Sequence, residues 1–472
     1  MASFYVHNFG CRATQADGAA LEHQFELRGL ERAADASQAN VVVLNTCTVT
    51  ASADQDARAA IRRVHRENPG ARIVVTGCYA QRSPEELAAL PGVASVIGNS
   101  HKHELVDLVL PGNIPPIAPA QEFANPGFVR LENLGQRPAN SAHRPIFVSD
   151  IFAHTELLAA PVFDGANQRT RPNLKVQDGC DNRCSFCVIP FVRGQSRSLS
   201  PARILNEIES LVSAGFREVV ISGINLGRWG RDLETSDPLA FGSQPSRFEH
   251  LVRAILEHTS LEKLRISSVE PMDWSDELIA LVAGSPRIAQ HAHVPMQSGS
   301  DAVLRRMHRR YRPWHYRENI QKIRAAMPDA AIGADVMVGF PGETDAEFEE
   351  TRQMIEDLPF TYLHVFTFSS RPGTPAAAMP QQVPVPVARE RNRILRDLAD
   401  RKHESFLNSF VGRTIQAITL ARTNEAASTE ALTDNYLKLR IAARLDPNEW
   451  VRVDVQGVED GALVATLPAT VS

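Results

Sequence analysis

The chain has 472 residues, more than a single hydrophobic core usually supports, so two to four domains are expected. Hydrophobic residues make up 43% and charged residues 22% of the chain, which excludes collagen-like, disordered and membrane-embedded classes for the whole. The net charge of -5 gives no overall electrostatic case for nucleic acid, and 6 cysteines are too few for a disulfide scaffold. Neither a membrane span nor a signal peptide is recognised, so we expect a cytoplasmic protein with no membrane partner.

The first predicted domain, residues 1–111, is an α/β domain with a parallel sheet. Short apolar runs alternate there with helix-like stretches, as in successive βαβ units. The predicted strands are Phe4–His7, Val41–Leu44, Ile73–Thr76 and Ala94–Ile97, and the predicted helices are Ala16–Leu27, Ala53–His65, Pro84–Leu90 and His101–Leu108. We therefore expect the carboxyl ends of these strands to meet at one edge of the sheet, where open α/β folds bind ligands.

Three cysteines follow predicted strands of this domain within a few residues. They are Cys11, Cys47 and Cys78, separated by 36 and 31 residues, each about one βαβ repeat. Neighbouring strands lie roughly 5 Å apart, so three adjacent strand ends span about 10 Å, which suits a bound cluster better than a disulfide. Gly10 and Gly77, before two of these cysteines, fit a close approach of the backbone to a bulky group. The alternative is three unrelated buried thiols, since free cysteine is common in protein cores.

The rest of the chain divides into four predicted segments. Residues 112–170 are rich in Pro, Gly, Asn and Gln and predict a connector, with a short strand at Ile146–Ser149. Residues 171–387 predict a partial (β/α)6 barrel, whose site would lie at the carboxyl ends of its strands. The predicted strands are Leu174–Gln177, Glu218–Ser222, Lys263–Ser267, His291–Pro295, Ile332–Val338 and Tyr362–Phe366. A linking helix is predicted for residues 388–404, and a small antiparallel β module for residues 405–468.

A second cysteine triplet, Cys180, Cys184 and Cys187, follows the first predicted barrel strand with the spacing C-x3-C-x2-C. Thiolates suit iron–sulfur clusters or zinc, but a structural zinc site needs four closed ligands. No fourth cysteine follows, and the nearest histidines lie far away in the sequence. Three thiolates on a 4Fe-4S cluster would leave one iron open for a non-protein ligand, whereas a zinc site with a remote fourth ligand is the alternative.

This cysteine spacing at the first strand of a βα barrel resembles the radical S-adenosylmethionine (radical SAM) superfamily. The resemblance implies that SAM binds the open iron and that one electron cleaves SAM to a 5′-deoxyadenosyl radical. The residues that it implies at the SAM site are Phe186, Ser222, Gly223, Ser268 and Glu270. For Ser268 and Glu270, ordinary loop contacts are the alternative.

The chain as a whole resembles the radical SAM methylthiotransferase family. The matching stretches include Asn45-Thr46-Cys47, Thr76-Gly77-Cys78-Tyr79-Ala80-Gln81, Pro295-Met296-Gln297-Ser298-Gly299 and Gly339-Phe340-Pro341-Gly342-Glu343-Thr344. The resemblance implies a second 4Fe-4S cluster, bound by the first cysteine triplet, and an RNA-binding β module of the TRAM type at the carboxyl end. One SAM molecule would methylate cluster-bound sulfur, and a second would supply the radical that removes hydrogen from a C–H bond before the methylthio group is inserted. The family pattern has Asn where this chain has Thr14. The departure affects an expected hydrogen bond near the cluster of Cys11, Cys47 and Cys78, and not the cluster ligands themselves.

The resemblance implies one of three substrates: isopentenyladenosine in tRNA, threonylcarbamoyladenosine in tRNA, or an aspartate of a ribosomal protein. Val176-Gln177-Asp178-Gly179-Cys180, Pro190–Ser198 and Ile221–Gly230 look most like the threonylcarbamoyladenosine group. The resemblance therefore implies a tRNA methylthiotransferase that modifies C2 of N6-threonylcarbamoyladenosine beside the anticodon, with an electron donor as a partner and a sulfur source that the sequence does not fix. A non-catalytic iron–sulfur RNA-binding protein is the alternative of another class.

Basic residues make the local case for RNA. Residues 305–317 combine arginines with aromatic side chains, which offers phosphate contacts and stacking faces together. The predicted contacts to RNA are Arg193, Arg197, Arg309 and Arg310, of which Arg193 and Arg197 could instead meet the substrate's carboxylate. Against this, the tail from residue 405 holds six Arg or Lys and eight Asp or Glu, a balance that a ribosomal-protein substrate would tolerate better.

Three polar residues on predicted barrel strands have plainer interpretations. His291 and His293 alternate along one strand and are predicted to be packed or hydrogen-bonded inside the barrel rather than to bind a metal. Asp335 could hydrogen-bond the ribose of SAM or simply fill the barrel.

Overall fold

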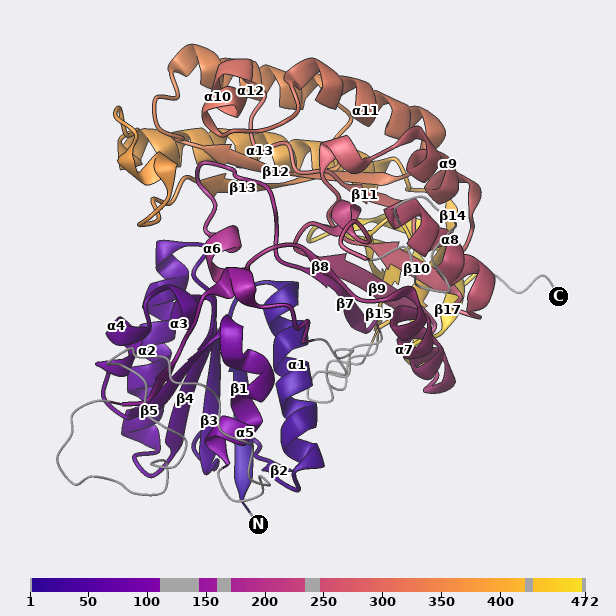
Figure 1. Ribbon diagram of the computed structural model, residues 1–472. Coiled ribbons are helices and arrows are strands. Elements are labelled where there is room, and N and C mark those ends of the chain that lie inside the picture. The colour runs from indigo at the N-terminus through magenta and orange to yellow at the C-terminus, as the bar shows by residue number, and fades with distance from the viewer. Residues whose placement is uncertain (1, 111–143, 159–170, 234–246, 421–427, 469–472) are drawn as a thin grey trace. The chain divides into compact units, whose positions relative to one another are not determined.

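A computed structural model describes residues 2–110, 144–158, 171–233, 247–420 and 428–468 (Figure 1). The chain forms two compact units. Unit 1 comprises Met1–Val162, Asp178–Asn182 and Cys187–Arg197, and unit 2 comprises Phe163–Gln177, Arg183–Phe186 and Ser198–Ser472. Most of the connector predicted at residues 112–170 lies outside the described residues. In the part of the chain that is described, no helix is both long and apolar enough to cross a membrane.

Unit 1 is built on a six-stranded parallel sheet with the order β2-β1-β3-β4-β5-β6. The strands are β1 (Ser3–Asn8), β2 (Glu31–Arg32), β3 (Val41–Thr46), β4 (Arg72–Gly77), β5 (Val93–Gly98) and β6 (Ile146–Phe147). The four strands predicted in residues 1–111 correspond to β1, β3, β4 and β5, and the strand predicted at Ile146–Ser149 joins the same sheet as β6. The parallel α/β fold predicted for the amino-terminal domain is confirmed.

Helices cover both faces of this sheet, as Figure 1 shows. The helices of unit 1 are α1 (Arg12–Leu27), α2 (Ala51–Glu67), α3 (Cys78–Arg82), α4 (Pro84–Ala88), the 3-10 helix η1 (Asn99–Glu104), α5 (Leu105–Val109), the 3-10 helix η3 (Ile151–Ala153) and α6 (Ile189–Arg193). Successive strand residues point to opposite faces, so Val42 packs with Ile61 of α2, whereas Val43 packs with Phe25 of α1. Every residue of β3 is buried, as expected for a parallel strand that is covered on both sides.

Unit 2 contains six parallel barrel strands that neighbour one another in chain order. The strands are β7 (Asn173–Asp178), β9 (Glu218–Gly223), β10 (Lys263–Ile266), β11 (His291–His293), β12 (Ala331–Val338) and β13 (Tyr362–Thr367). One sheet has the order β10-β9-β7-β8, with β8 (Arg197–Ser198) at its edge, and a second has the order β11-β12-β13. A parallel bridge joins Leu264 of β10 to Ile288, which lies three residues before β11. All six predicted barrel strands are therefore present.

The helices of unit 2 alternate with these strands. They are α7 (Pro201–Ser213), η4 (Leu226–Arg228), α8 (Phe248–His258), η5 (Pro271–Asp273), α9 (Asp276–Gly284), α10 (Asp301–Arg306), α11 (Pro313–Ala326), α12 (Asp345–Asp357) and η6 (Pro375–Ala378). Figure 1 shows α10, α11 and α12 together along one side of β12 and β13. The start of α12 is fixed by a capping box, in which Thr344 accepts from the Glu347 N–H and Glu347 accepts from the Thr344 N–H.

The carboxyl-terminal strands close into a small five-stranded barrel with the order β14-β15-β16-β18-β17. The strands are β14 (Thr414–Thr419), β15 (Thr429–Thr433), β16 (Lys438–Ile441), β17 (Trp450–Glu459) and β18 (Ala462–Thr466). The predicted module was antiparallel, but β16 and β18 pair in parallel, because strand directions cannot alternate all the way round a closed ring with an odd number of strands. The predicted linking helix lies within α13 (Val385–Asn408). The domain boundaries proposed from the sequence stay predictions.

Candidate functional site

The first cysteine triplet lies at the carboxyl edge of the unit 1 sheet. Cys11 is the residue before α1 and follows β1, Cys47 directly follows β3, and Cys78 begins α3 directly after β4. These three strands are neighbours in the sheet. Cys47 and Cys78 are buried, whereas Cys11 is exposed. The parallel topology thus brings together three thiols that are far apart in the sequence.

These thiols lie close enough to influence one another's ionisation. Burial and then the nearby Cys78 thiol raise the pKa of Cys47 to about 11, and the Cys11 thiol adds to the rise. A thiol with such a pKa is protonated near neutral pH, so binding a metal there requires the loss of protons. Three cysteines converging on one sheet edge supply three of the four ligands of a 4Fe-4S cluster, so the residues present fit such a group with one iron open.

Two glycines make room for this convergence. Gly10 has a φ of +88°, and a Cβ on it would lie 2.7 Å from Cβ of Cys47. Gly77 has a φ of +97°, and a Cβ on it would lie 2.3 Å from the backbone oxygen of Thr46. The sequence predicted a close backbone approach at both glycines, and the groups that they approach are the Cys47 side chain and the end of β3.

Polar side chains contact two of the cysteines. Nδ2 of Asn99 lies 3.6 Å from Sγ of Cys78 and donates to the Val192 carbonyl at 2.7 Å. Oγ1 of Thr14 lies 3.5 Å from Sγ of Cys11 and accepts from Arg193 Nη2 at 3.4 Å. The Thr14 hydroxyl therefore makes polar contact with Cys11 at the position where the family pattern has Asn.

Two buried cations lie beside this triplet. Arg193 donates to both carboxylate oxygens of Asp178 at 3.0 Å and to Asp17 at 3.0 Å. Lys102 donates to Asp17 at 3.0 Å and to Asn45 at 3.1 Å. Burial by itself lowers the pKa of Arg193, but Asp178 and the Cys78 thiol raise it above its ordinary value, so the guanidinium stays charged. Arg193 and Lys102 thus place two basic side chains beside the first cysteine triplet, where a cluster with three thiolate ligands would add negative charge.

This network corrects one prediction from the sequence. Arg193 is only 2% exposed, so it is not available for RNA or for the substrate's carboxylate. Arg197 is half-buried, and its Nη1 donates to the backbone carbonyls of His154 and Gln195 at 3.2 and 3.4 Å. The sequence did not indicate that Lys102 or Asp17 lies at a site, because each falls in a stretch with the pattern of an ordinary amphipathic helix.

We expect Arg193→Met to destabilise unit 1 strongly. Removing one partner of a buried ion pair costs about 3–5 kcal/mol, since Asp178 would be left buried without its counter-charge. The melting temperature and the iron content of the reconstituted chain measure the effect. Arg62→Met is the matched control, because Arg62 is exposed on α2 of the same unit. Equal melting temperatures for the two variants would contradict the structural role of Arg193.

The loop that carries Cys180 is held by its neighbours in unit 1. The Cys180 N–H donates to the Gly194 carbonyl at 3.1 Å, and the Gly179 N–H donates to Asp178 at 2.8 Å. A Cβ on Gly179 would lie 1.8 Å from the Gln195 carbonyl oxygen, so no larger residue fits there. Asp178 thereby joins this cysteine loop to the buried Arg193.

Cys184 lies beside a second buried arginine, within unit 2. Arg309 Nη1 donates to Cys184 Sγ at 3.3 Å, and its Nη2 forms an ion pair with Glu270. Burial lowers the pKa of Arg309, but Tyr311 and Glu270 raise it above its ordinary value. Arg309 is 7% exposed and does not offer the RNA contact that was predicted, whereas its neighbour Arg310 is exposed. The arrangement instead places a cation and the predicted SAM-site residue Glu270 next to a cysteine of the second triplet.

The remaining predicted SAM-site residues lie in unit 2, and Ser222, Gly223 and Ser268 lie at or just after strand ends. Phe186 packs edge-on against Phe340, with their ring centroids 6.4 Å apart. Ser222 is buried at the end of β9, and a Cβ on Gly223 would lie 2.8 Å from Oε1 of Gln177. Ser268 Oγ lies 2.7 Å from Nδ1 of His293. The structure therefore gives Ser268 a specific side-chain partner on β11.

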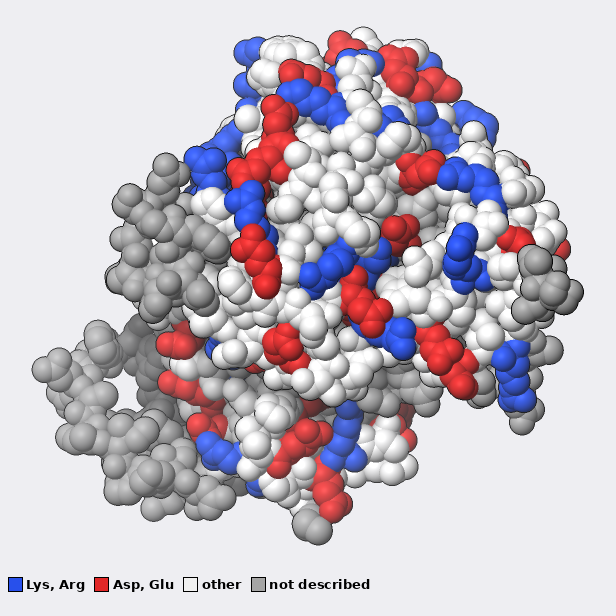
Figure 2. Space-filling model, turned by 90° about the vertical axis from the view of Figure 1, so that its right-hand side faces the viewer, with Lys and Arg blue, Asp and Glu red and all other residues white. Residues whose placement is uncertain are grey.

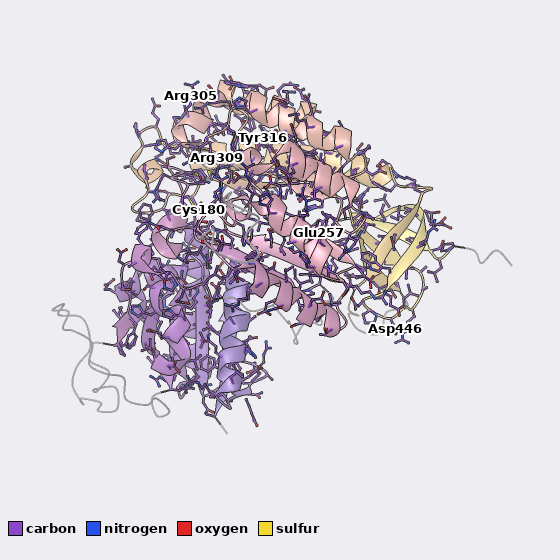
Figure 3. The ribbon with its side chains drawn as sticks, turned by 45° about the vertical axis from the view of Figure 1, so that its right-hand side comes forward. Cys180, Glu257, Arg305, Arg309, Tyr316 and Asp446 are labelled. Atoms are coloured by element: carbon purple, nitrogen blue, oxygen red, sulfur yellow. The ribbon has the colours of Figure 1, made fainter. Side chains whose placement is uncertain are left out.

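The basic run at residues 305–317 is largely paired with carboxylates. Arg305 and Arg312 both form ion pairs with Asp301, and Arg317 pairs with Asp357. Figure 3 shows Arg305 on the outer helical layer and Arg309 farther inward. Figure 2 shows basic and acidic side chains interspersed on the face that it presents. The run therefore supplies less free positive charge than its sequence suggested.

Comparisons with known proteins find matches to both segments that carry the cysteine triplets. Residues 3–98 match "Uncharacterized protein family UPF0004", and residues 174–355 match the radical SAM superfamily. A Bacillus subtilis protein named threonylcarbamoyladenosine tRNA methylthiotransferase MtaB is 35% identical over 93% of this chain and 90% of its own length. The Rickettsia prowazekii protein of the same name is 34% identical over 98% of this chain and 97% of its own.

Two further likenesses complete the comparison. A Thermobifida fusca protein named tRNA-2-methylthio-N(6)-dimethylallyladenosine synthase is 33% identical over 88% of this chain and 77% of its own. The solved structure of the radical SAM methyltransferase TsrM from Kitasatospora setae, with cobalamin and a 4Fe-4S cluster bound, has a TM-score of 0.52 and 17% identity. It covers 80% of this chain and 77% of that one, and the likeness concerns the fold alone. With relatives this similar over nearly the full length, the chain belongs to the MiaB-like radical SAM methylthiotransferases, enzymes of a superfamily that implies SAM and a 4Fe-4S cluster.

Proposed function

We propose that this methylthiotransferase acts on tRNA and inserts a methylthio group at C2 of N6-threonylcarbamoyladenosine next to the anticodon. Support for this nucleoside comes from the relatives named for it in Bacillus subtilis and Rickettsia prowazekii, at 35% and 34% identity. The Thermobifida fusca enzyme, at 33%, supports the dimethylallyl nucleoside as the second candidate. The acidic balance of the tail is the one feature that favours a ribosomal-protein aspartate.

The cofactor assignment in this proposal uses both cysteine triplets. Cys180, Cys184 and Cys187 would hold the 4Fe-4S cluster at which SAM is cleaved, and Cys11, Cys47 and Cys78 would hold a second one. The observation that carries the second site is the convergence of three thiols at one sheet edge beside the buried Arg193. When bound, the cluster held by Cys180, Cys184 and Cys187 would supply the electron that cleaves SAM, and the cluster held by Cys11, Cys47 and Cys78 would carry the sulfur that is methylated and transferred. An electron donor is required, and dithionite can replace it in an assay.

The protein's own residues position these groups. Arg309 donates to Cys184 Sγ and forms an ion pair with Glu270. This ion pair fixes a charged hydrogen-bond donor beside one predicted cluster ligand. Asn99 contacts Cys78 and ties it to the Val192 carbonyl of α6. Because these polar groups are held by buried hydrogen bonds, they need no reorganisation when charge changes at the sites.

The substrate is tested by the modified nucleosides of cellular tRNA. In cells that lack this protein, we expect mass spectrometry to show loss of the methylthio form of threonylcarbamoyladenosine, with the unmodified nucleoside accumulating and the methylthio isopentenyl form unchanged. Reintroducing the intact gene restores the product and serves as the control. Loss of the isopentenyl product instead would establish the second candidate, and an unchanged nucleoside profile would contradict a tRNA substrate.

A further inference from the structure

Three potential metal ligands converge on neighbouring barrel strands, away from every cysteine in the sequence. They are His293 at the end of β11, Asp335 on β12 and His364 on β13. One ligand atom from each lies within 4.8 Å of the other two. His293 is buried, Asp335 is half-buried and His364 is exposed, so the group has one closed and one open side.

Strand register explains why the three side chains share one face. Asp335 and His364 are direct partners across the parallel pair β12 and β13. His293 is the partner of Gly333, which lies two residues before Asp335 on β12. Side chains two residues apart on a strand point to the same face, so all three project from one side of this sheet.

The histidine and the carboxylate approach each other without forming a hydrogen bond. Nε2 of His293 lies 3.4 Å from Oδ1 of Asp335, and among the described residues this buried nitrogen has no hydrogen-bond partner. His293 is only 6% exposed, so an unpartnered ring nitrogen there is costly. This separation allows both atoms, together with the nearby ligand atom of His364, to bind one ion.

The other side of the His293 ring is held in place. Its Nδ1 lies 2.7 Å from Oγ of Ser268, which fixes the ring orientation as an outer hydrogen-bond partner does for metal-binding histidines. The ring of Tyr362 stacks on His293 with a centroid separation of 6.0 Å. A Cβ on Gly333 would come within 2.0 Å of this tyrosine ring, so only glycine allows the tyrosine to pack there.

We propose that His293, Asp335 and His364 bind a divalent first-row transition cation. Two imidazoles and one carboxylate on one face, with open positions opposite, are a known ligand set for such ions. The single carboxylate neutralises part of the charge, and the exposed side at His364 leaves room for water or another oxygen ligand. The sequence indicated packing or hydrogen bonding for His293, because alternation along one strand does not show what the next two strands place beside it. This proposal does not depend on the identity of the tRNA substrate.

The test uses Mn²⁺ on the fully reconstituted chain, because Mn²⁺ prefers oxygen and nitrogen ligands and does not compete for thiols. Free Mn²⁺ is counted from its electron paramagnetic resonance signal during titration of the oxidised protein, and elemental analysis after dialysis against Zn²⁺ gives an independent count. We expect one ion per chain in the parent protein, and binding weakened at least about tenfold in Asp335→Asn and in His364→Ala.

His315→Ala is the matched control, since His315 is an exposed histidine on α11 of the same unit. It should bind the ion as the parent does, and iron content and melting temperature check that all variants are folded. The proposal is overturned if neither Mn²⁺ nor Zn²⁺ binds to the parent beyond background, or if the Asp335 and His364 variants bind as tightly as the control. Methylthio transfer in the same preparations is scored separately, so failure of the metal site leaves the proposed function untouched.

Discussion

Cys184→Ala is expected to reduce the cleavage of SAM to the background level seen without protein. Two remaining thiolates would not retain the cluster that binds SAM, and the buried Arg309 would lose the sulfur to which it donates at 3.3 Å. The measurement is the formation of 5′-deoxyadenosine after anaerobic reconstitution and addition of SAM and dithionite. Iron should fall from about eight to about four per chain, a count set by the composition of each cluster.

The control for Cys184→Ala is the corresponding substitution in the other triplet, Cys78→Ala, which should still form 5′-deoxyadenosine. Glu270→Gln is an informative companion, because it removes the charge that pairs with Arg309 and leaves the cysteines in place. Cleavage by Cys184→Ala at the rate of the parent chain would refute the assignment of the second triplet to the SAM site. A parent chain with both clusters loaded and no cleavage at all would favour the non-catalytic alternative.

Cys78→Ala is expected to abolish methylthio transfer while the cleavage of SAM continues. Cys78 is 2% exposed, packs against Val188 and Val192, and lies close enough to Cys47 to raise the pKa of that thiol. Losing one of three ligands should release the second cluster, so iron again falls to about four per chain. Mass spectrometry of the tRNA nucleosides after reaction, together with the 5′-deoxyadenosine assay, measures both activities in one sample.

Cys78→Ser separates loss of a ligand from loss of packing, because a hydroxyl nearly preserves the volume of the thiol. It should behave as Cys78→Ala does in methylthio transfer, with a melting temperature near that of the parent. A variant that loses transfer but keeps about eight iron atoms would show that Cys78 does not hold a cluster.

Two adjacent arginines show which property of the site the sequence could not predict, namely the burial of individual charged side chains. Arg309 and Arg310 stand side by side in the same basic run, yet Arg309 is buried against Cys184 and Glu270 while Arg310 is exposed. The charge pattern is the same for both, and only the path of the chain after α10 decides which guanidinium turns inward. Arg193 is a similar case, since its partner Asp17 lies 176 residues earlier in the chain.

The fold itself was more predictable, because its signal is local. Apolar runs of strand length alternate with helical stretches in the sequence. The predicted runs correspond to β1, β3, β4 and β5 and to all six barrel strands. The short strand β6 could be located in the sequence, but its pairing with β5 across the undescribed residues 111–143 could not. In the carboxyl-terminal barrel, the parallel pair β16 and β18 follows from closing five strands into a ring, a property of the whole module.

The two cysteine triplets, and their expected place at strand ends, could be found from local sequence patterns. One cysteine follows each of three strands, and a C-x3-C-x2-C motif follows another strand. These are local patterns, and because the strands pair in parallel, their carboxyl ends lie at the same edge of each sheet. Which charges are buried beside these cysteines, and which side chains meet across strands, depends on long-range packing. Arg193 with Asp178, Arg309 with Glu270, and His293 with Asp335 are pairs made by register and long-range packing. The interaction energy of each pair depends on its burial and on the distance between its atoms, and local sequence patterns give neither quantity.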